Sequence, residues 1–202
     1  MTLARLNQSE LDRIKKAKPI FQAVEAITGV PWQAVAAVWY RESFSVSPPD
    51  TPGGQFQFDP VPPPEKLRKY LKVFTKLSDE EANKLIAAGV NKFQSAAVFA
   101  ACHMRWVSHY NLATDHSDEA MKDAFYGYNG RVFGPRPEAS NYVINEFDAK
   151  HDDMMIRGTI PDGHGGRKWI RTTDHRPGAF TVYRQLIDSK LECDQISVAA
   201  AG

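Results

Sequence analysis

The sequence predicts a mainly α-helical protein with one small irregular or β element. Two segments, residues 32–44 and 94–109, repeat apolar side chains at the i, i+3, i+4 spacing of helices with a buried face. Between them, residues 45–64 are so rich in proline and glycine that a long helix is excluded. Gln and Phe alternate near residues 53–60, which indicates a short strand or turn there.

The first predicted helix covers residues 9–27. Ser9 is the expected N-cap, with Asp12 three residues further on. Gly29 is expected to end the helix, because glycine tolerates the left-handed conformation that often follows a last turn. Pro31 suits the first position of the next helix.

The remaining helices are predicted from caps and apolar periodicity. They lie at residues 65–74, 79–88, 94–109, 117–126, 137–150 and 180–191. Ser78, with Glu81 three residues later, has the pattern of a capping box. The apolar run in the 94–109 helix predicts burial on most sides, with Cys102 as a buried thiol and Trp106 in the core.

The chain is expected to form a main domain over residues 1–150, with residues 151–202 as an extension packed on it. Much of the extension, residues 151–177, is polar and turn-rich. Its acidic and histidine residues lack a recognised ligand spacing, so no metal site is expected at His151, Asp152, Asp153 and His164.

Charge and hydropathy argue against several classes of function. The net charge is +1, and no basic stripe or phosphate-binding loop is present, so nucleic-acid binding is not expected. No apolar run reaches the roughly 18 residues of a membrane-spanning helix. Residues 1–18 are polar and of mixed charge, unlike a secretory signal, so synthesis in a cytosol is expected. Nothing in the sequence demands more than a monomer.

Four short motifs follow one another along the chain. They are Val30-Pro31-Trp32 leading to Glu42-Ser43, Gly54-Gln55-Phe56-Gln57, Tyr126-Gly127-Tyr128-Asn129-Gly130, and Tyr142-Val143. Their order over roughly residues 28–147 resembles that of the lysozyme-like lytic transglycosylases and their relatives, the goose-type lysozymes and phage endolysins. The resemblance implies a lysozyme-like helical fold of the soluble lytic transglycosylase type, with residues 1–150 as the catalytic domain.

The resemblance also implies a reaction and a set of roles. The enzyme would cut the β-1,4 bond between N-acetylmuramic acid and N-acetylglucosamine in peptidoglycan, leave 1,6-anhydro-muramic ends, and need no cofactor. Glu42 would be the single acid/base. By the same resemblance, Tyr142 would orient Glu42, Gln57 and Asn129 would bind the sugar and its N-acetyl group, Tyr128 would wall the cleft, and Ser43 would position substrate.

The position of Glu42 suits a general acid. Cleavage of a glycosidic bond needs a carboxylic acid that is still protonated near neutral pH. Glu42 ends a mainly apolar helix, where the helix dipole carries partial negative charge. That dipole, together with partial burial against aromatic rings, is expected to raise the pKa of its carboxyl.

Two other functions stay open at this point. A hydrolysing lysozyme would need a second carboxylate to activate water, and Asp50 and Asp59 are the candidates. A non-catalytic glycan-binding or virion structural protein could keep the fold alone. For a transglycosylase and for a hydrolysing lysozyme alike, the absence of a secretory signal together with this chemistry indicates a phage or prophage lysin. Such a lysin is made in the host cytoplasm and acts on the cell wall, or is carried in a virion.

The sequence departs from the family in four ways. Gln55-Phe56 stands where the family has Leu-Met, and Gly127 stands where it has Ala. The interval from Glu42 to Gln57 is 57 − 42 = 15 residues, a little shorter than the family usually shows. The spacer over residues 60–91 is longer and more charged than the family's spacer.

Overall fold

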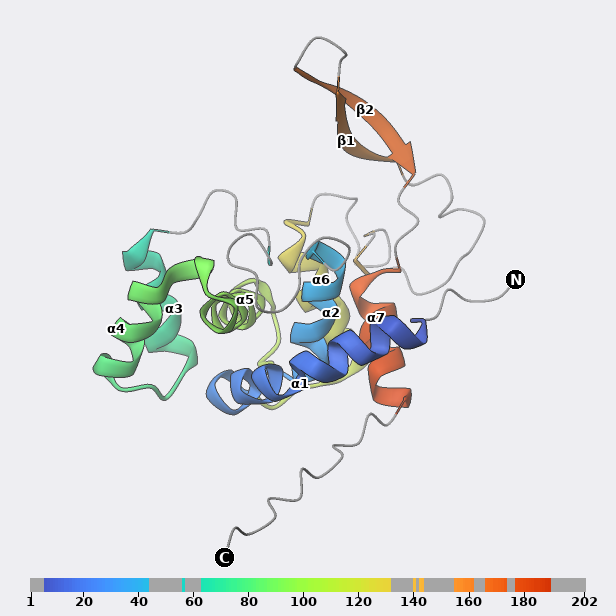
Figure 1. The fold of residues 1–202 in the computed structure, drawn as a ribbon. Coiled ribbons are helices and arrows are strands. Elements are labelled where there is room, and N and C mark those ends of the chain that lie inside the picture. The colour runs from blue at the N-terminus through green and yellow to red at the C-terminus, as the bar shows by residue number, and fades with distance from the viewer. Residues whose placement is uncertain are drawn as a thin grey trace, which may run out of the picture.

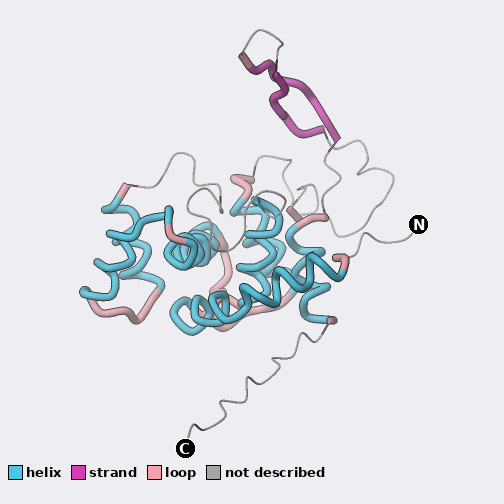
Figure 2. Tube along the Cα trace, in the orientation of Figure 1, coloured by secondary structure: helices cyan, strands magenta, loops and turns pink. Residues whose placement is uncertain are grey.

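The computed structural model describes residues 6–43, 56, 63–131, 140, 142–143, 155–161, 166–173 and 177–189. Within them the protein is mainly helical, which confirms the predicted class (Figures 1 and 2). The elements are α1 (Gln8–Thr28), α2 (Trp32–Ser43), α3 (Pro64–Phe74), α4 (Asp79–Ala88), the 3-10 turn η1 (Gly89–Asn91), α5 (Phe93–Val107), α6 (Asp118–Tyr128), β1 (Met155–Pro161), β2 (Arg167–Thr173) and α7 (Ala179–Asp188).

The N-cap of helix α1 lies two residues earlier than predicted. The N-cap is Asn7, not Ser9: the Asn7 side chain accepts from the Glu10 amide at 3.0 Å, and the Glu10 carboxylate accepts from the Asn7 amide at 2.7 Å. This reciprocal box satisfies two amides that would otherwise lack partners, so it determines where the helix starts. The predicted C-terminus is confirmed, since Gly29 has φ 74° and its amide donates to the Glu25 carbonyl at 2.7 Å.

The capping box at α4 is also confirmed. The Ser78 hydroxyl accepts from the Glu81 amide at 3.3 Å, and the Glu81 carboxylate accepts from the Ser78 amide at 2.8 Å. Helix α6 is capped by Ser117, which accepts from the Ala120 amide at 3.3 Å. Both starts follow from a hydroxyl residue just before a turn rich in acidic side chains.

The core is built around α2 and α5. Helix α5 packs against α1, α2, α3 and α6, and α2 packs against α1, α5 and α7. A cluster of aromatic rings joins these helices: Phe93 lies 5.7 Å from both Phe21 and Trp39, and 5.8 Å from Phe56. Phe56 is buried, so one residue of the proline- and glycine-rich segment is anchored directly in the core.

Cys102 on α5 is a buried free thiol, as predicted, and burial raises its pKa to about 12. Cys193 lies outside the described residues. The prediction for Trp106 was wrong, because 45% of this side chain is exposed. Trp106 sits on the side of α5 that faces α3, where it contacts Tyr70 and Phe74 rather than the inner rings.

The segment expected to be a helix over residues 137–150 is described only at three positions. Ser140 lies in a bend, and Tyr142 and Val143 lie in a turn closed by a 2.9 Å bond from the Val143 amide to the Ser140 carbonyl. These residues are therefore not helical, contrary to the prediction. The Tyr142 carbonyl instead accepts from the Phe180 amide at 2.9 Å, which satisfies an amide in the first turn of α7.

The C-terminal extension contributes a helix and a hairpin. Helix α7 packs against α2 and α6. Strands β1 and β2 pair antiparallel, and Figure 1 shows this hairpin apart from the helices. The hairpin was not predicted, because apolar and polar residues do not alternate regularly along either strand: Met155 and Ile156 are adjacent in β1, as are Trp169 and Ile170 in β2.

No single helix among the described residues is long and apolar enough to span a membrane. Helices α4 and α5 together have enough length and apolar composition, but the chain bends by 111° between them.

Candidate functional site

Glu42 lies in the last turn of α2 and is partly buried. The helix that carries it is among the most buried in the protein, with Trp39 and Arg41 almost fully enclosed. The C-terminal end of α6 comes next to it, since the Glu42 carboxylate is close enough to Tyr128 to act on its ionisation. A carboxyl group is therefore held at the edge of the core, near enough to an aromatic hydroxyl for its charge to act on it.

Tyr128, the last residue of α6, has a desolvated hydroxyl. Burial, and next the nearby charge of Glu42, raise the pKa of the Tyr128 phenol well above its ordinary value. The phenol is consequently neutral at neutral pH. Its hydroxyl donates to the Phe56 carbonyl at 3.1 Å, which ties α6 to the loop that carries the second motif.

Tyr142 completes this group. Only 5% of its side chain is exposed. One face of its ring stacks on Tyr128, with centroids 6.4 Å apart and planes at 27°, and the Arg41 guanidinium lies 5.3 Å from its centroid. A cation this close to a buried ring holds it in place electrostatically. The proposed hydrogen bond from Tyr142 to Glu42 stays a prediction.

Of the predicted site residues, Tyr128 stacks on Tyr142 and feels the charge of Glu42, which lies far from both of them in the sequence. Asn129 follows directly as the C-cap of α6, with its amide donating to the Phe125 carbonyl at 3.2 Å. Ser43 ends α2, but its side chain lies outside the description. Gln57 and the candidate second carboxylates Asp50 and Asp59 lie outside the described residues.

His103 on α5 is a neighbour of the site that the motifs did not indicate. Its ring lies 5.3 Å from Tyr128 in an edge-to-face arrangement, and its Nδ1 lies 3.1 Å from the Tyr70 hydroxyl. Burial, and next the charge of Lys66, lower the pKa of His103 to about 4, so the imidazole is neutral near neutral pH. The sequence gives no indication that His103 lies beside Tyr128, because it is a single histidine in an apolar helix and its partners come from α3 and α6.

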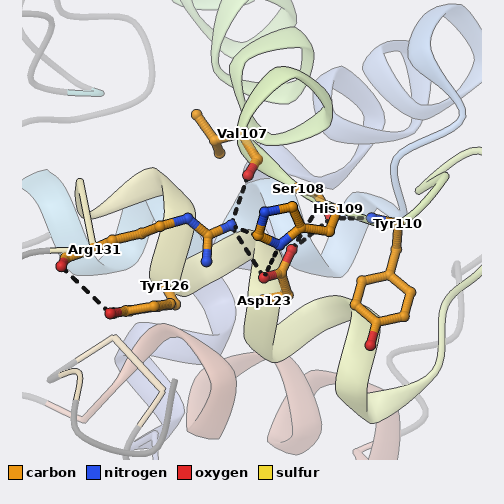
Figure 3. A network of polar contacts seen from close by, with 7 residues as sticks. All are labelled: Val107, Ser108, His109, Tyr110, Asp123, Tyr126 and Arg131. Carbon is orange, nitrogen blue, oxygen red and sulfur yellow. Dashed lines mark hydrogen bonds and ion pairs between the residues drawn. The ribbon is translucent and has the colours of Figure 1, made fainter. Parts of the chain in front are cut away.

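A buried carboxylate holds the end of α6 and the segment after it (Figure 3). Asp123 accepts from the His109 amide at 2.7 Å, from the Ser108 hydroxyl at 3.1 Å and from the Arg131 guanidinium at 3.0 Å. Burial alone would raise the pKa of Asp123, but these bonds outweigh it and hold the pKa below its ordinary value. His109 also contacts Asp123 through Nδ1, at 3.0 Å.

Arg131 is the second half of this network. It has φ 55°, which is unfavourable for a residue with a side chain, so its position must be held by other contacts. Its guanidinium donates to the Val107 carbonyl at 2.8 Å and lies 5.0 Å from the Tyr126 ring centroid. Because Arg131 and Asp123 flank Tyr128 and Asn129 in the sequence, the network fixes the turn that carries the third motif.

The departure at Gly127 has a structural cause. A β carbon there would lie 2.8 Å from Val107 Cγ2 and 2.9 Å from the Val107 carbonyl oxygen, closer than such atoms normally approach. The same carbonyl accepts from Arg131, so it is not free to move. The Ala expected here from the resemblance would not fit between α6 and the end of α5 as they are packed in this chain.

We therefore expect Gly127→Ala to destabilise the protein. Overpacking costs about 1–3 kcal/mol, and the better helix propensity of Ala returns only about 1 kcal/mol. Urea unfolding at equilibrium measures the net change. Gly89→Ala cannot serve as a control, because Gly89 has φ 61°. Ala87→Gly at an exposed position of α4 instead measures the helix-propensity effect alone. A Gly127→Ala protein more stable than wild type would contradict the packing described.

No group of three or more His, Cys, Asp or Glu side chains within the described ranges is arranged to hold a metal ion. His151, Asp152, Asp153 and His164 lie outside those ranges. Comparison of the chain with protein-family models, with curated proteins and with solved structures found no match.

Proposed function

We propose that this chain is a lysozyme-like lytic transglycosylase that cuts peptidoglycan at the β-1,4 bond between N-acetylmuramic acid and N-acetylglucosamine. The observation that carries the proposal is that Tyr128 at the end of α6 stacks on Tyr142 and feels the charge of Glu42 at the end of α2, so that it links the three residues. Each comes from a different motif of the family resemblance. Nothing in their spacing along the sequence requires this link, so it supports a shared role.

In the proposed reaction, Glu42 carries the proton in both steps. Its carboxylic acid first donates the proton to the glycosidic oxygen as the bond from C1 of the muramic residue breaks. The resulting carboxylate then takes the proton from the C6 hydroxyl of the same sugar, whose oxygen bonds to C1. The products are a free N-acetylglucosamine hydroxyl and a 1,6-anhydro ring, and Glu42 ends in its starting form. No water and no cofactor take part.

Two observations suit this chemistry. Glu42 is partly buried at the end of an otherwise buried helix, and its charge acts on the buried phenol of Tyr128, which stacks on Tyr142. Partial burial is the kind of surrounding in which a general acid keeps its proton. Asn129, Gln57 and Ser43 are assigned to sugar binding by resemblance. The biological setting we propose is bacterial lysis by a phage-encoded enzyme, released from the host cytoplasm to the wall or carried in a virion.

Incubation with purified peptidoglycan tests the proposal. Release of soluble fragments with anhydro ends is expected, whereas fragments with reducing ends would mean a hydrolase. In that case Asp50→Asn and Asp59→Asn separate the two candidate bases, because only the true base loses activity. Binding to peptidoglycan without any release of fragments would instead favour a glycan-binding or virion structural protein.

A further inference from the structure

The spacer over residues 60–91, which is longer and more charged than the spacer of the family that the chain resembles, contains a basic helix near the site. Helix α3 carries Lys66, Arg68, Lys69 and Lys72, all exposed, against a single acid, Glu65. The whole chain has a net charge of only +1, so this positive charge is local. Local charge of one sign on an exposed helix attracts an anionic ligand.

Two of these lysines lie over aromatic rings on one side of α3. Lys66 Nζ is 5.6 Å from the Tyr70 ring centroid, and Lys69 Nζ is 4.7 Å from the Trp106 ring centroid. Residues three apart share a face of a helix, and the exposed Val73 continues the same face. Lys66, Lys69, Val73 and Trp106 are called the α3–α5 surface below.

The charges of Lys66 and Lys69 are available to a ligand. Among the described residues, neither Lys66 nor Lys69 forms an ion pair with a carboxylate. Arg68, which lies off this face, instead donates to the Asn83 side chain on α4 at 2.6 Å. The indole of Trp106 is 45% exposed, which is unusual for so large an apolar side chain.

A series of ring contacts connects the α3–α5 surface with Glu42. Trp106 lies 5.5 Å from Tyr70, Tyr70 lies 6.0 Å from His103, and His103 lies 5.3 Å from Tyr128. Tyr128 is the neighbour of Glu42. Lys66 is also close enough to His103 for its charge to act on the imidazole, so the surface approaches the site from the α3 side.

We propose that the α3–α5 surface binds the peptide-bearing glycan strand, with Lys66 and Lys69 contacting carboxylates of the stem peptides and Trp106 stacking on a sugar ring. This inference rests on the proposed function. Carboxylates and ammonium groups form charge-assisted hydrogen bonds, and the C–H face of a pyranose buries apolar area against an indole. The surface therefore makes the enzyme prefer strands that still carry their peptides.

The test compares peptidoglycan with intact stems and glycan strands whose peptides have been removed with an amidase. For Lys66→Glu combined with Lys69→Glu, KM on peptide-bearing strands is expected to rise roughly tenfold, as for two exposed ion pairs that become repulsive. Amidase cleavage leaves one lactyl carboxylate on each muramic residue but removes the carboxylates of the stem, so the rise on stripped strands is expected to be clearly smaller. The difference between the two substrates is expected to shrink as salt is raised. Trp106→Ala is expected to raise KM severalfold on both substrates.

The matched control is Arg68→Glu combined with Lys72→Glu, which makes the same change of charge elsewhere on the same helix. If this control and the Lys66/Lys69 variant raise KM equally, the surface is only a general electrostatic feature and the proposal is overturned. Equal KM for wild type on both substrates also overturns it.

Binding separates failure of this proposal from failure of the proposed function. Cosedimentation with insoluble peptidoglycan is measured for all variants in a Glu42→Gln background. Selective loss of binding in the Lys66/Lys69 variant supports the surface even if wild type releases no fragments, in which case only the enzyme assignment fails. Unchanged binding in that variant rejects the surface.

Discussion

Glu42→Gln is expected to lower the rate of peptidoglycan cleavage by about two to four orders of magnitude, the usual contribution of a general acid/base. Gln keeps the shape of the side chain at the end of α2 but can neither donate nor accept the transferred proton. Release of soluble fragments from purified peptidoglycan measures the loss. The thermal midpoint and the circular dichroism spectrum should remain those of the folded protein.

Glu119→Gln is the matched control for this change. Glu119 lies in the first turn of α6 and is exposed, so the same loss of charge there should leave cleavage within about twofold of wild type. A Glu42→Gln protein that cleaves at the control's rate would remove Glu42 from the mechanism.

Asp123→Ala is expected to cause the largest loss of stability, about 2–4 kcal/mol. The change leaves the His109 amide, the Ser108 hydroxyl and the Arg131 guanidinium without their common acceptor. Arg131 would then lose a contact that holds it at φ 55°. Equilibrium unfolding in urea measures the effect.

The effect of Asp123→Ala is expected to be large because Asp123 is buried. Asp118→Asn is the control, because it removes an exposed carboxylate from the same helix. Asp118 lies on the same helix and pairs with Arg184 at 3.2 Å, but its side chain is 48% exposed. Exposed pairs contribute about 0–1 kcal/mol, so the control should lose less than that. Equal losses in the two variants would show that the Asp123 network does not hold α6.

The Asp123 network also predicts a dependence of stability on pH. The folded-state pKa of Asp123 lies below its ordinary value, so its carboxylate stabilises the fold fully above about pH 4. That stabilisation is lost as the pH falls through the folded-state pKa. The stability difference between wild type and Asp123→Asn should therefore be constant near neutral pH and shrink below about pH 4. A gap that widens on acidification would contradict the direction of the shift.

Local signals along the chain were enough to predict most helices. Gly29 and the Ser78–Glu81 pair act through neighbouring amides, so their effect can be recognised without knowing the fold. The N-cap was misplaced at Ser9 because Asn7, two residues earlier, offers the same chemistry with a better partner in Glu10. Which of the two residues caps the helix depends on geometry over only one turn and on free-energy differences of a fraction of a kcal/mol.

Features that depend on distant partners could not be predicted. The turn at Tyr142 accepts an amide from α7, and His103 lies between side chains of α3 and α6. Nor does any local pattern show that Asp123 would be buried beside Arg131. The grouping of Glu42 with Tyr128 and Tyr142 was expected from the order of the family motifs, not from periodicity.

Mass spectrometry of the muropeptides released from purified peptidoglycan tests the central claim most directly. Wild type is expected to produce fragments with 1,6-anhydro-muramic ends, and Glu42→Gln is expected to produce none above background. Reducing ends from wild type would contradict the transglycosylase mechanism and point to a base such as Asp50 or Asp59. Release of anhydro fragments by Glu42→Gln at the wild-type rate would contradict the role of Glu42.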